Sequence, residues 1–161
     1  MKIVSLSQEQ VHCFRDCYLG VWHSLKGILP DEYVETQIKQ ASSKEFQEKL
    51  SEAVTDTRNI MMMTTEKNET IGIAWGRIQD DGSSWLAFIG VLPDNRQKGV
   101  GASLLAEFIN ESRKEGAKKI SLNTDPRLIP AVNLYETRGF HVGGTTKNKY
   151  GLELIIYSKE I

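Results

Sequence analysis

Six consecutive residues, Arg96-Gln97-Lys98-Gly99-Val100-Gly101, carry the groups that bind phosphate in proteins. The two glycines lack a Cβ, so a ligand can approach the backbone closely, and the two basic side chains add positive charge. The apolar run Trp85 to Val91 precedes them as a buried strand would, and helical apolar spacing follows from Ala102. Such a loop leaves backbone N–H groups unpaired at the positive end of a helix dipole. The segment is therefore predicted to bind an anion, although a plain strand-to-helix turn has the same pattern.

Two well-known nucleotide loops are excluded by the spacing. A Walker A loop requires Gly-Lys followed by Ser or Thr, whereas Lys98 precedes Gly99 here and no hydroxyl follows in register. The dinucleotide fingerprint requires a third glycine after Gly101, where this chain continues with Ala102-Ser103-Leu104. The anion is therefore not expected to be a nucleotide held in either of these ways.

A second segment, Ala131 to Phe140, contains a tyrosine at position 135. Its apolar spacing predicts a short helix that ends at Gly139, with Phe140 leading into the next strand. Taken alone, the segment is explained equally well by packing of Leu134 and Phe140, with Tyr135 as an amphipathic surface residue. The tyrosine gains a functional interpretation only together with the glycine loop.

The rest of the chain alternates between extended and helical patterns that must position these two segments. Strands are expected at 3–6, 60–65, 70–75, 85–91, 119–123, 141–146 and 152–157. Helices are expected after Ser7 as N-cap to Leu25, after Asp31 as cap to Ala53 with an interruption at Ser42-Ser43, from the glycine loop to Glu115 with Gly116 beyond it, and at 131–138. The order β-α-α-β-β-β-α-β-α-β-β predicts one mixed α/β sheet with helices on both faces.

Length and composition fit one domain over residues 1–161. The formal net charge of −1 gives no basis for nucleic-acid binding, and no apolar run approaches the ~20 residues of a membrane span. The first residues lack the apolar core of a signal peptide. Cys13 and Cys17, with no metal-ligand cluster around them, are expected to be free thiols in a reducing cytoplasm, and no metal is expected.

Together, Val91 to Gly101 and Ala131 to Glu136 with Gly139-Phe140 closely resemble the GCN5-related N-acetyltransferases (GNAT). In that family the first segment is the acetyl-CoA diphosphate loop, with the pattern Arg or Gln, two residues, Gly, one residue, Gly or Ala. Arg96, Gly99 and Gly101 match it in full. The resemblance implies a single-domain GNAT fold whose mixed, mostly antiparallel sheet is splayed at a central V. It divides the domain into an acceptor side (1–57), central strands with the acetyl-CoA loop and helix (58–116), and a closing unit (117–161).

The resemblance also implies roles for individual residues. The strand before the loop is expected to carry a bulge at Gly90 and to splay from its parallel neighbour, so that the pantetheine arm inserts there. Backbone N–H groups near Val91 would stabilise the oxyanion, and Tyr135 would be the general acid for the CoA thiolate, since a phenol of pKa about 10 stays protonated at pH 7. Acetyl-CoA, as co-substrate, is expected to contact Val91, Arg96, Gln97, Lys98, Gly99, Val100, Gly101, Ala102 and Asn133.

A general base is not assigned by the sequence. Many relatives place a glutamate on the strand ahead of the loop, but residues 85–91 contain no acid. Asp80 and Asp81 lie upstream in a turn of ordinary composition. The remaining candidates are His12, His23 and His141, of which His23 lies in a helix that borders the acceptor cleft in relatives. A water relay, or an acceptor of low pKa, would make a base unnecessary.

The acceptor is expected to be a primary amine on a small molecule. The segment Trp22 to Tyr33 resembles one found in many bacterial small-molecule members. Its aromatic side chains with Asp31, Glu32 and Glu35 suit a cationic amine, although each residue is also explained by core packing or helix capping. Transfer to a peptide N-terminus or a lysine, and CoA sensing without catalysis, stay open as alternatives. Whether the chain forms a homodimer through its C-terminal strands is open as well.

Overall fold

The computed structural model describes all residues from Met1 to Ile161 and contains one seven-stranded sheet with the order β1-β2-β3-β4-β5-β7-β6. Every neighbouring pair is antiparallel except β4 and β5, which run parallel. The expected mixed, mostly antiparallel sheet is therefore confirmed. The strands are β1 (Lys2–Ser5), β2 (Asn59–Glu66), β3 (Glu69–Ile78), β4 (Ser84–Val91), β5 (Lys119–Thr124), β6 (His141–Lys147) and β7 (Glu153–Glu160).

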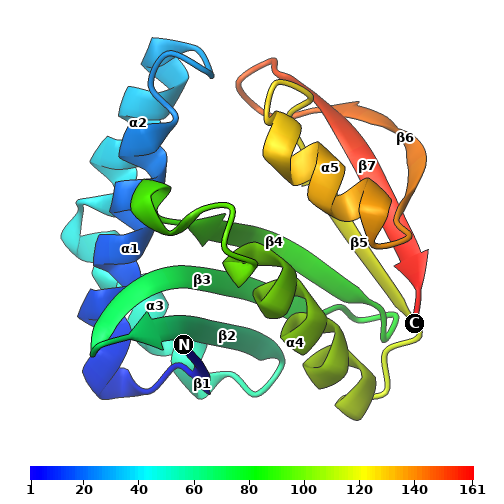
Figure 1. Ribbon diagram of the computed structural model, residues 1–161, viewed down its shortest axis with the longest axis horizontal. Helices are drawn as coiled ribbons and strands as arrows, with labels where there is room; N and C mark the ends of the chain where they lie inside the picture. Colours follow the sequence, from blue (N-terminus) through cyan, green and yellow to red (C-terminus); the bar gives the residue numbers. More distant parts are fainter.

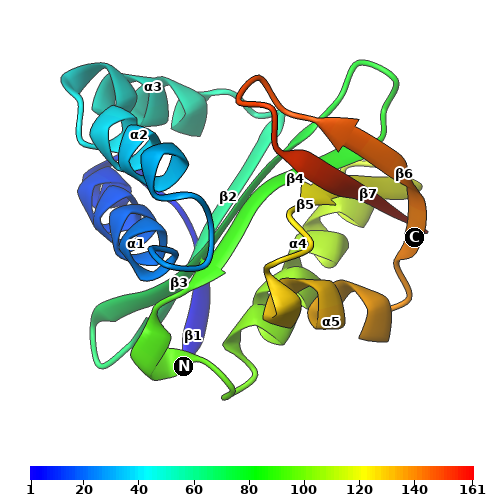
Figure 2. The same cartoon turned by 90° about the horizontal axis from the view of Figure 1, so that it is seen from above.

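Helices cover both faces of the sheet, as expected (Figure 2). One face carries α1 (Val11–Ser24), α2 (Asp31–Ala41) and α3 (Lys44–Thr55), and the other carries α4 (Val100–Lys114) and α5 (Ile129–Thr137). Short 3-10 turns at Gln8–Gln10 and Pro93–Asn95 precede α1 and the glycine loop. A membrane-spanning helix is absent, because none of these helices is both long and apolar enough.

Strand β2 explains why the centre of the sheet has continuous apolar sequence. Ile60 and Met62 belong to the core under α4, whereas Met61 and Met63 pack with α1 and α3 on the opposite face. Successive side chains of a strand point to opposite faces, so burial on both faces requires apolar residues at every position. The hairpin expected from residues 60–75 is the central β2–β3 pair.

The sheet opens between β4 and β5 (Figure 1). The two parallel strands pair only at their beginnings, where Ser84 is opposite Ile120 and Trp85 is opposite Ser121. Beyond these residues β4 has no partner on that side, although its pairing with β3 continues to Val91. This gap is the predicted V. The glycine loop follows the free end of β4, and α5 follows β5, so both functional segments lie beside it.

The expected bulge at Gly90 is wrong, because the irregularity of β4 lies elsewhere. Trp75 is opposite Phe88 and Gly76 is opposite Leu86, which leaves Ala87 as the extra residue. Gly90 pairs regularly within the β3–β4 ladder. Its glycine is a packing requirement, since a Cβ there would lie 2.9 Å from both Cγ atoms of Val21 on α1.

The helix ends follow the capping signals with two exceptions, of which the first is Ser7: it caps the short 3-10 turn, and Gln10 is at the cap position of α1. The break at Ser42-Ser43 separates α2 from α3, and Ser43 Oγ accepts a hydrogen bond from Phe46 N–H at 3.1 Å. Gly116, with a φ of 86°, follows the end of α4 as expected. Asp31 is the first residue of α2 and not its cap, because Pro30 occupies the cap position.

Candidate functional site

The glycine loop presents a row of free backbone donors at the start of α4. Gln97 and Gly99 have positive φ angles of 61° and 81°. None of the N–H groups of residues 97–102 donates a hydrogen bond within the protein, and the first to do so is that of Ser103, to Gly99 C=O at 3.0 Å. Successive free N–H groups at the positive end of a helix form a concavity suited to an anion.

The two glycines of the loop serve different purposes. A Cβ on Gly99 would meet no atom within 4 Å, so its left-handed φ angle, not lack of space, is what favours glycine there. A Cβ on Gly101 would lie 3.7 Å from Leu134 of α5 and 3.8 Å from Val91 of β4. Gly101 therefore marks the point where the loop, the end of β4 and α5 meet.

The two basic side chains of the loop differ in their partners. Arg96 is bound by the protein itself, because its Nε donates to Val91 C=O at 2.9 Å and its Nη2 donates to Ser24 Oγ at 2.7 Å. Lys98 is exposed and has no partner in the protein. Lys98 thus offers a free charge to an anion, whereas the Arg96 guanidinium fastens the end of β4 to α1.

The backbone of Val91 is turned toward the V. Leu92 N–H bonds to Ile71 C=O at 2.9 Å, and the polar groups of an antiparallel strand alternate in direction. The N–H and C=O of Val91 therefore point away from β3, toward the gap beside β5. Arg96 occupies the C=O, so the N–H is the free polar group of Val91.

Tyr135 is a buried residue and not a surface tyrosine. It is 4% exposed, and its ring centroid lies 5.7 Å from that of Phe140 and 5.9 Å from that of Tyr157. Its hydroxyl forms no hydrogen bond within the protein. Burial raises the pKa of Tyr135 well above its usual value. The phenol therefore stays protonated and has a proton to donate at neutral pH.

Asn133 is exposed on α5, one residue before Leu134, and its side chain has no protein partner. Leu134 and Val91 both pack against the core cluster that contains Tyr135. The elements therefore bring the loop, Val91 and the part of α5 around Leu134 to one end of the V, whereas the approach of the Tyr135 hydroxyl to a ligand there stays a prediction. Contact of Asn133 and Ala102 with a cofactor stays a prediction.

Aromatic side chains from three elements gather on the opposite side of β4. The ring centroid of Tyr18 on α1 lies 4.5 Å from that of Phe88 on β4, and the centroid of Trp22 lies 6.3 Å from it. Tyr33 of α2 continues the row, 5.7 Å from Trp22. Burial raises the pKa of Tyr33, so its hydroxyl is neutral as well. The segment expected to wall the acceptor side thus forms an aromatic cluster against β4.

In Figure 1, α2 and the β6–β7 loop face each other across the splay of the sheet, and side-chain contacts join them. The ring of Tyr150 lies 5.1 Å from that of Tyr33, edge to face. Gln40 Nε2 donates to Tyr150 Oη at 3.3 Å. These contacts join the N-terminal helices to the C-terminal strands. Asp31, Glu32 and Glu35 are exposed on the same helix.

The aspartates considered as general bases lie far from Val91. Asp80 pairs with Arg58 at 2.7 Å, and Asp81 accepts a hydrogen bond from Ser83 N–H at 2.9 Å. Both precede β4, and a strand rises about 3.3 Å per residue, so they lie at the opposite end of the strand from Val91. Neither can reach a group bound beside Val91.

The histidines are dispersed over the fold. His12 is at the start of α1, where its Nε2 lies 3.4 Å from Cys13 Sγ, and His141 is exposed at the start of β6. His23 is exposed in the last turn of α1, beside the Ser24 that binds Arg96. Of the three, only His23 is placed near the glycine loop.

Asp125 directly follows β5, and sequence reasoning missed it. It is 4% exposed, and its carboxylate accepts hydrogen bonds from Arg127 N–H and Nε at 2.9 Å and from Nη2 at 2.7 Å. Burial alone raises the pKa of a carboxyl, but these bonds outweigh it and lower the pKa of Asp125 below its usual value. Asp125 is therefore a fixed, paired anion and a poor base.

Ser24 and Tyr150 were also missed, for the same reason as Asp125. Ser24 lies near the end of the first helical pattern but is not one of its apolar positions. Tyr150 lies in a turn before Gly151. Their partners are distant in the chain, so no local pattern identifies them. No group of three or more His, Cys, Asp or Glu side chains is placed to hold a metal ion.

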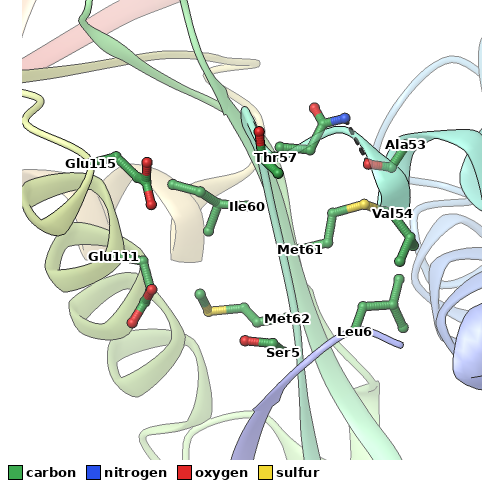
Figure 3. Close-up of a pocket in the computed structure, with 11 residues that line it drawn as sticks. Ser5, Leu6, Ala53, Val54, Thr57, Ile60, Met61, Met62, Glu111 and Glu115 are labelled. Atoms are coloured by element: carbon green, nitrogen blue, oxygen red, sulfur yellow. Dashed lines mark hydrogen bonds between the residues drawn. The ribbon is translucent and has the colours of Figure 1, made fainter. Parts of the chain in front are cut away.

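A hollow of about 210 Å³ lies at the β1–β2 edge of the sheet, away from these residues (Figure 3). Leu6 and Val54 line it on the α3 side, and Glu111 and Glu115 of α4 line the other side. β1 ends at Ser5, so the beginning of β2 has no strand beside it. The hollow therefore follows from the short first strand, and it contains no residue of the loop or of α5.

The model of the Acetyltransferase (GNAT) family matches residues 22–140 of the chain. Among curated proteins, the UPF0157 protein YqkA of Bacillus subtilis (strain 168) is 39% identical over 67 residues, which are 42% of this chain and 19% of that protein. The chain therefore spans about a fifth of the length of this relative.

Several solved structures share the fold. The PaiA N-acetyltransferase from Thermoplasma acidophilum in complex with coenzyme A has a TM-score of 0.83 and 20% identity, with 99% of this chain and 98% of that chain covered. The aminoglycoside 6′-acetyltransferase type Ii has a TM-score of 0.75, 18% identity and coverage of 99% and 97%. The ribosomal-protein-S18-alanine N-acetyltransferase from Escherichia coli has a TM-score of 0.75, 20% identity and coverage of 99% and 93%.

At these identities the likeness to solved structures concerns the fold. The family match covers most of the chain and includes the splayed strands, the glycine loop and α5. With its loop of free donors at the end of β4, this chain belongs to the acetyltransferase (GNAT) family.

Proposed function

We propose that the protein transfers the acetyl group of acetyl-CoA to a primary amine of a small molecule. Membership of the acetyltransferase family supports the acetyl transfer. The free N–H groups of residues 97–102 support CoA as the carrier, because its diphosphate is an anion that such a loop can hold. The coenzyme A bound to the PaiA N-acetyltransferase, which has the same fold, supports the same carrier.

In this proposal the loop holds the diphosphate with its N–H groups and with Lys98. The gap between β4 and β5 takes the pantetheine arm. The N–H of Val91 donates to the thioester carbonyl and stabilises the negative charge that develops on its oxygen when the amine attacks. A fixed donor of this kind contributes roughly 3 kcal/mol to stabilisation of the transition state.

Tyr135 is the general acid of the proposed reaction. The neutral amine nitrogen bonds to the carbonyl carbon. Collapse of the resulting tetrahedral intermediate breaks the carbon–sulfur bond, and the nitrogen loses its second proton to water. Tyr135 donates a proton to the departing sulfur and regains one from solvent. The phenol is protonated at neutral pH, which this role requires. Burial raises its pKa further, so the proton is donated only to a sulfur on which negative charge has developed.

Deprotonation of the amine is assigned to water. An alkylammonium group has a pKa near ~10 and must lose a proton before it attacks. The acceptor side of β4 carries Phe88 in place of an acid, and the nearby Asp125 is already paired with Arg127. In this proposal the proton leaves through water at the mouth of the V, and His23, exposed near the glycine loop, is the side chain that stays a candidate base.

The bridge between Tyr33 and Tyr150 is the observation that carries the choice of a small acceptor. An extended peptide needs an open groove for its backbone, and this bridge narrows the opening between α2 and the β6–β7 loop. The exposed carboxylates Asp31, Glu32 and Glu35 on the same helix favour a positively charged amine. Acetylation of peptide N-termini or lysines is the alternative to be tested.

The test measures thiol release from acetyl-CoA over a panel of polyamines, aminoglycosides, amino acids and peptides, with the melting temperature recorded with and without CoA. We expect CoA to raise the melting temperature and a small amine, but no peptide, to support turnover. Turnover with peptides but with none of the small amines would mean that the acceptor is a peptide or protein and not a small molecule. Stabilisation by CoA without any turnover would favour a sensor. No stabilisation by millimolar CoA would overturn the proposal.

A further inference from the structure

The hollow beside the beginning of β2 combines unpaired backbone groups with two carboxylates (Figure 3). It lies at the edge of the sheet, where β1 ends at Ser5 and leaves the first residues of β2 without a neighbouring strand. Its lining includes two acids, Glu111 and Glu115, and no cation. It contains no residue of the glycine loop or of α5, so what it binds is separate from the proposed reaction.

Two backbone groups of β2 face this hollow without a partner. Arg58 C=O accepts a hydrogen bond from Ile78 N–H of β3 at 2.8 Å, and successive residues of an antiparallel strand turn their polar groups in opposite directions. The C=O of Asn59 therefore points toward the hollow. Met61 is turned the same way, because its C=O accepts from Leu6 N–H at 2.9 Å, yet Leu6 C=O receives no hydrogen bond in return. The early end of β1 thus leaves one acceptor, Asn59 C=O, and one donor, Met61 N–H.

The two sides of the hollow differ in their chemistry. In Figure 3, Ile60 lies on the same side of β2 as Glu111 and Glu115. Glu115 forms no salt bridge, and Glu111 pairs only with an exposed lysine of its own helix, at 2.6 Å. Leu6 and Val54 line the other side, toward α3. A lysine or arginine side chain on the α4 side could therefore lay its methylene stem on Ile60 and place its charge at the carboxylates, whereas the α3 side suits an apolar side chain.

We propose that the hollow binds an extended segment of a partner polypeptide as a short added strand, with the residue pattern apolar, basic, apolar. The segment runs in the direction of β1, so the carbonyl of its first residue accepts from Met61 N–H and the N–H of its third residue donates to Asn59 C=O. The middle residue then lies opposite Ile60. Residues directly opposite in an antiparallel pair point to the same face, so the basic side chain reaches the two carboxylates of α4. A small amine uses the carboxylates alone, whereas a polypeptide segment uses the strand groups as well.

The test is an NMR titration of the isotope-labelled protein with short capped peptides, in the absence of acetyl-CoA. The first peptide has valine, lysine and valine between two glycines. The second carries glutamate in place of lysine, and the third carries a methyl group on the backbone nitrogen of the second valine, which removes the hydrogen bond to Asn59. We expect the first peptide to bind about tenfold more tightly than the second and about five- to tenfold more tightly than the third. Its binding is expected to slow hydrogen exchange of the Met61 amide.

A double variant tests the role of the carboxylates. Glu111→Gln combined with Glu115→Gln is expected to weaken binding of the lysine peptide about three- to tenfold and to abolish its advantage over the glutamate peptide. Glu153→Gln is the matched control, because Glu153 is exposed on β7, on the far side of the sheet from β2, and its loss changes the net charge in the same sense. This variant is expected to keep the preference for the lysine peptide. Unfolding curves establish that the substitutions leave the fold intact.

Absence of binding at millimolar peptide, or equal affinities for the lysine and glutamate peptides, would overturn the inference. Resonance changes confined to the glycine loop and the aromatic residues of α1 and α2 would overturn it as well, because the peptide would then occupy the acceptor side. Butylamine that protects the same residues, together with no effect of the N-methyl group, would replace the strand by a small cation. A dimer that sedimentation detects and the lysine peptide dissociates would make a second copy of the chain the occupant. None of these outcomes bears on the proposed acetyl transfer.

Discussion

Arg96 Nη2 lies 2.7 Å from Ser24 Oγ and thereby ties the loop after β4 to the last turn of α1. The same guanidinium holds Val91 C=O through Nε, and Ser24 Oγ donates onward to Val21 C=O at 2.5 Å. The end of the central strand and a helix on the acceptor side are therefore parts of one hydrogen-bonded unit. A side chain that belongs to a ligand-binding motif serves here to join protein to protein.

Arg96 and Lys98 are expected to respond differently to the same substitution. Arg96→Gln removes two hydrogen bonds from a charged group, so we expect the free energy of unfolding to fall by about 1–3 kcal/mol. Lys98→Gln removes only an exposed charge, so we expect stability to change by less than about 0.5 kcal/mol and CoA binding to weaken, with a smaller dependence on salt. Urea unfolding and calorimetry at two salt concentrations measure both. Unchanged stability of the Arg96 variant would contradict the assignment.

Tyr135→Phe is expected to fold normally and to lower kcat by about 10²-fold or more, because it removes the proton donor and keeps the packed ring. Single-turnover measurements ensure that chemistry is the step observed. Tyr157→Phe is the matched control. Tyr157 lies on β7, and its hydroxyl donates a hydrogen bond to Glu136. Full single-turnover activity of Tyr135→Phe would remove Tyr135 from the mechanism.

Tyr150→Ala is expected to widen the range of acceptors. The substitution deletes the ring contact with Tyr33 and the hydrogen bond from Gln40, and with them the bridge across the V. We expect bulkier amines to gain activity relative to the smallest active amine, while the affinity for CoA stays unchanged. The specificity ratio kcat/KM of a bulky to a small amine measures the effect. The same ratio in variant and parent would show that the bridge does not limit access.

Cys17 is expected to make stability fall at alkaline pH. Burial raises the pKa of its thiol from 9.0 to about 12, so the folded protein retains the proton after the unfolded chain has released it. Stability from this group is complete below pH 9 and declines by roughly 1.4 kcal/mol per pH unit as the pH rises from 9 toward 12. Unfolding of Cys17→Ala at pH 7.5 to 10.5 is expected to depend less on pH. Cys13→Ala, a substitution on the same helix, is the control. Its stability is expected to depend on pH as strongly as that of the unchanged protein if Cys17 causes the effect.

Gly90→Ala tests whether this glycine is required by packing. The added methyl group meets both Cγ atoms of Val21 at 2.9 Å, so we expect a loss of about 1–3 kcal/mol in stability. Val21→Ala removes the obstructing atoms, and the double variant is expected to be more stable than the sum of the single effects predicts. Additive losses would mean that Gly90 serves another purpose.

The element order, the glycine loop and the existence of the V could be predicted because each depends on patterns within a short stretch of chain. The turn chemistry of Gly99 is local, since a φ angle of 81° favours glycine wherever it occurs. The bulge could not be placed, because Ala87 is the extra residue only in relation to the register of β3. A strand's own sequence does not determine that register.

The partners of the site residues were beyond local patterns for a similar reason. Arg96 reaches a serine 72 residues earlier in the chain, and Tyr33 meets a tyrosine from the last hairpin. The sequence also gave no sign that Tyr135 is buried, since its side-chain type fits a surface as well as a core. These contacts arise only when the two halves of the sheet are brought together.

The separation of β4 from β5 has a consequence for aggregation. It creates a strand edge in the interior of the sheet, where backbone groups such as the N–H of Val91 face no neighbouring strand. Exposed edges invite pairing with other chains, and proteins protect them by covering them. Here helices of both layers lie beside the gap, which limits the approach of a polypeptide strand from another molecule (Figure 2). The same architecture that leaves the edge unpaired therefore also guards it.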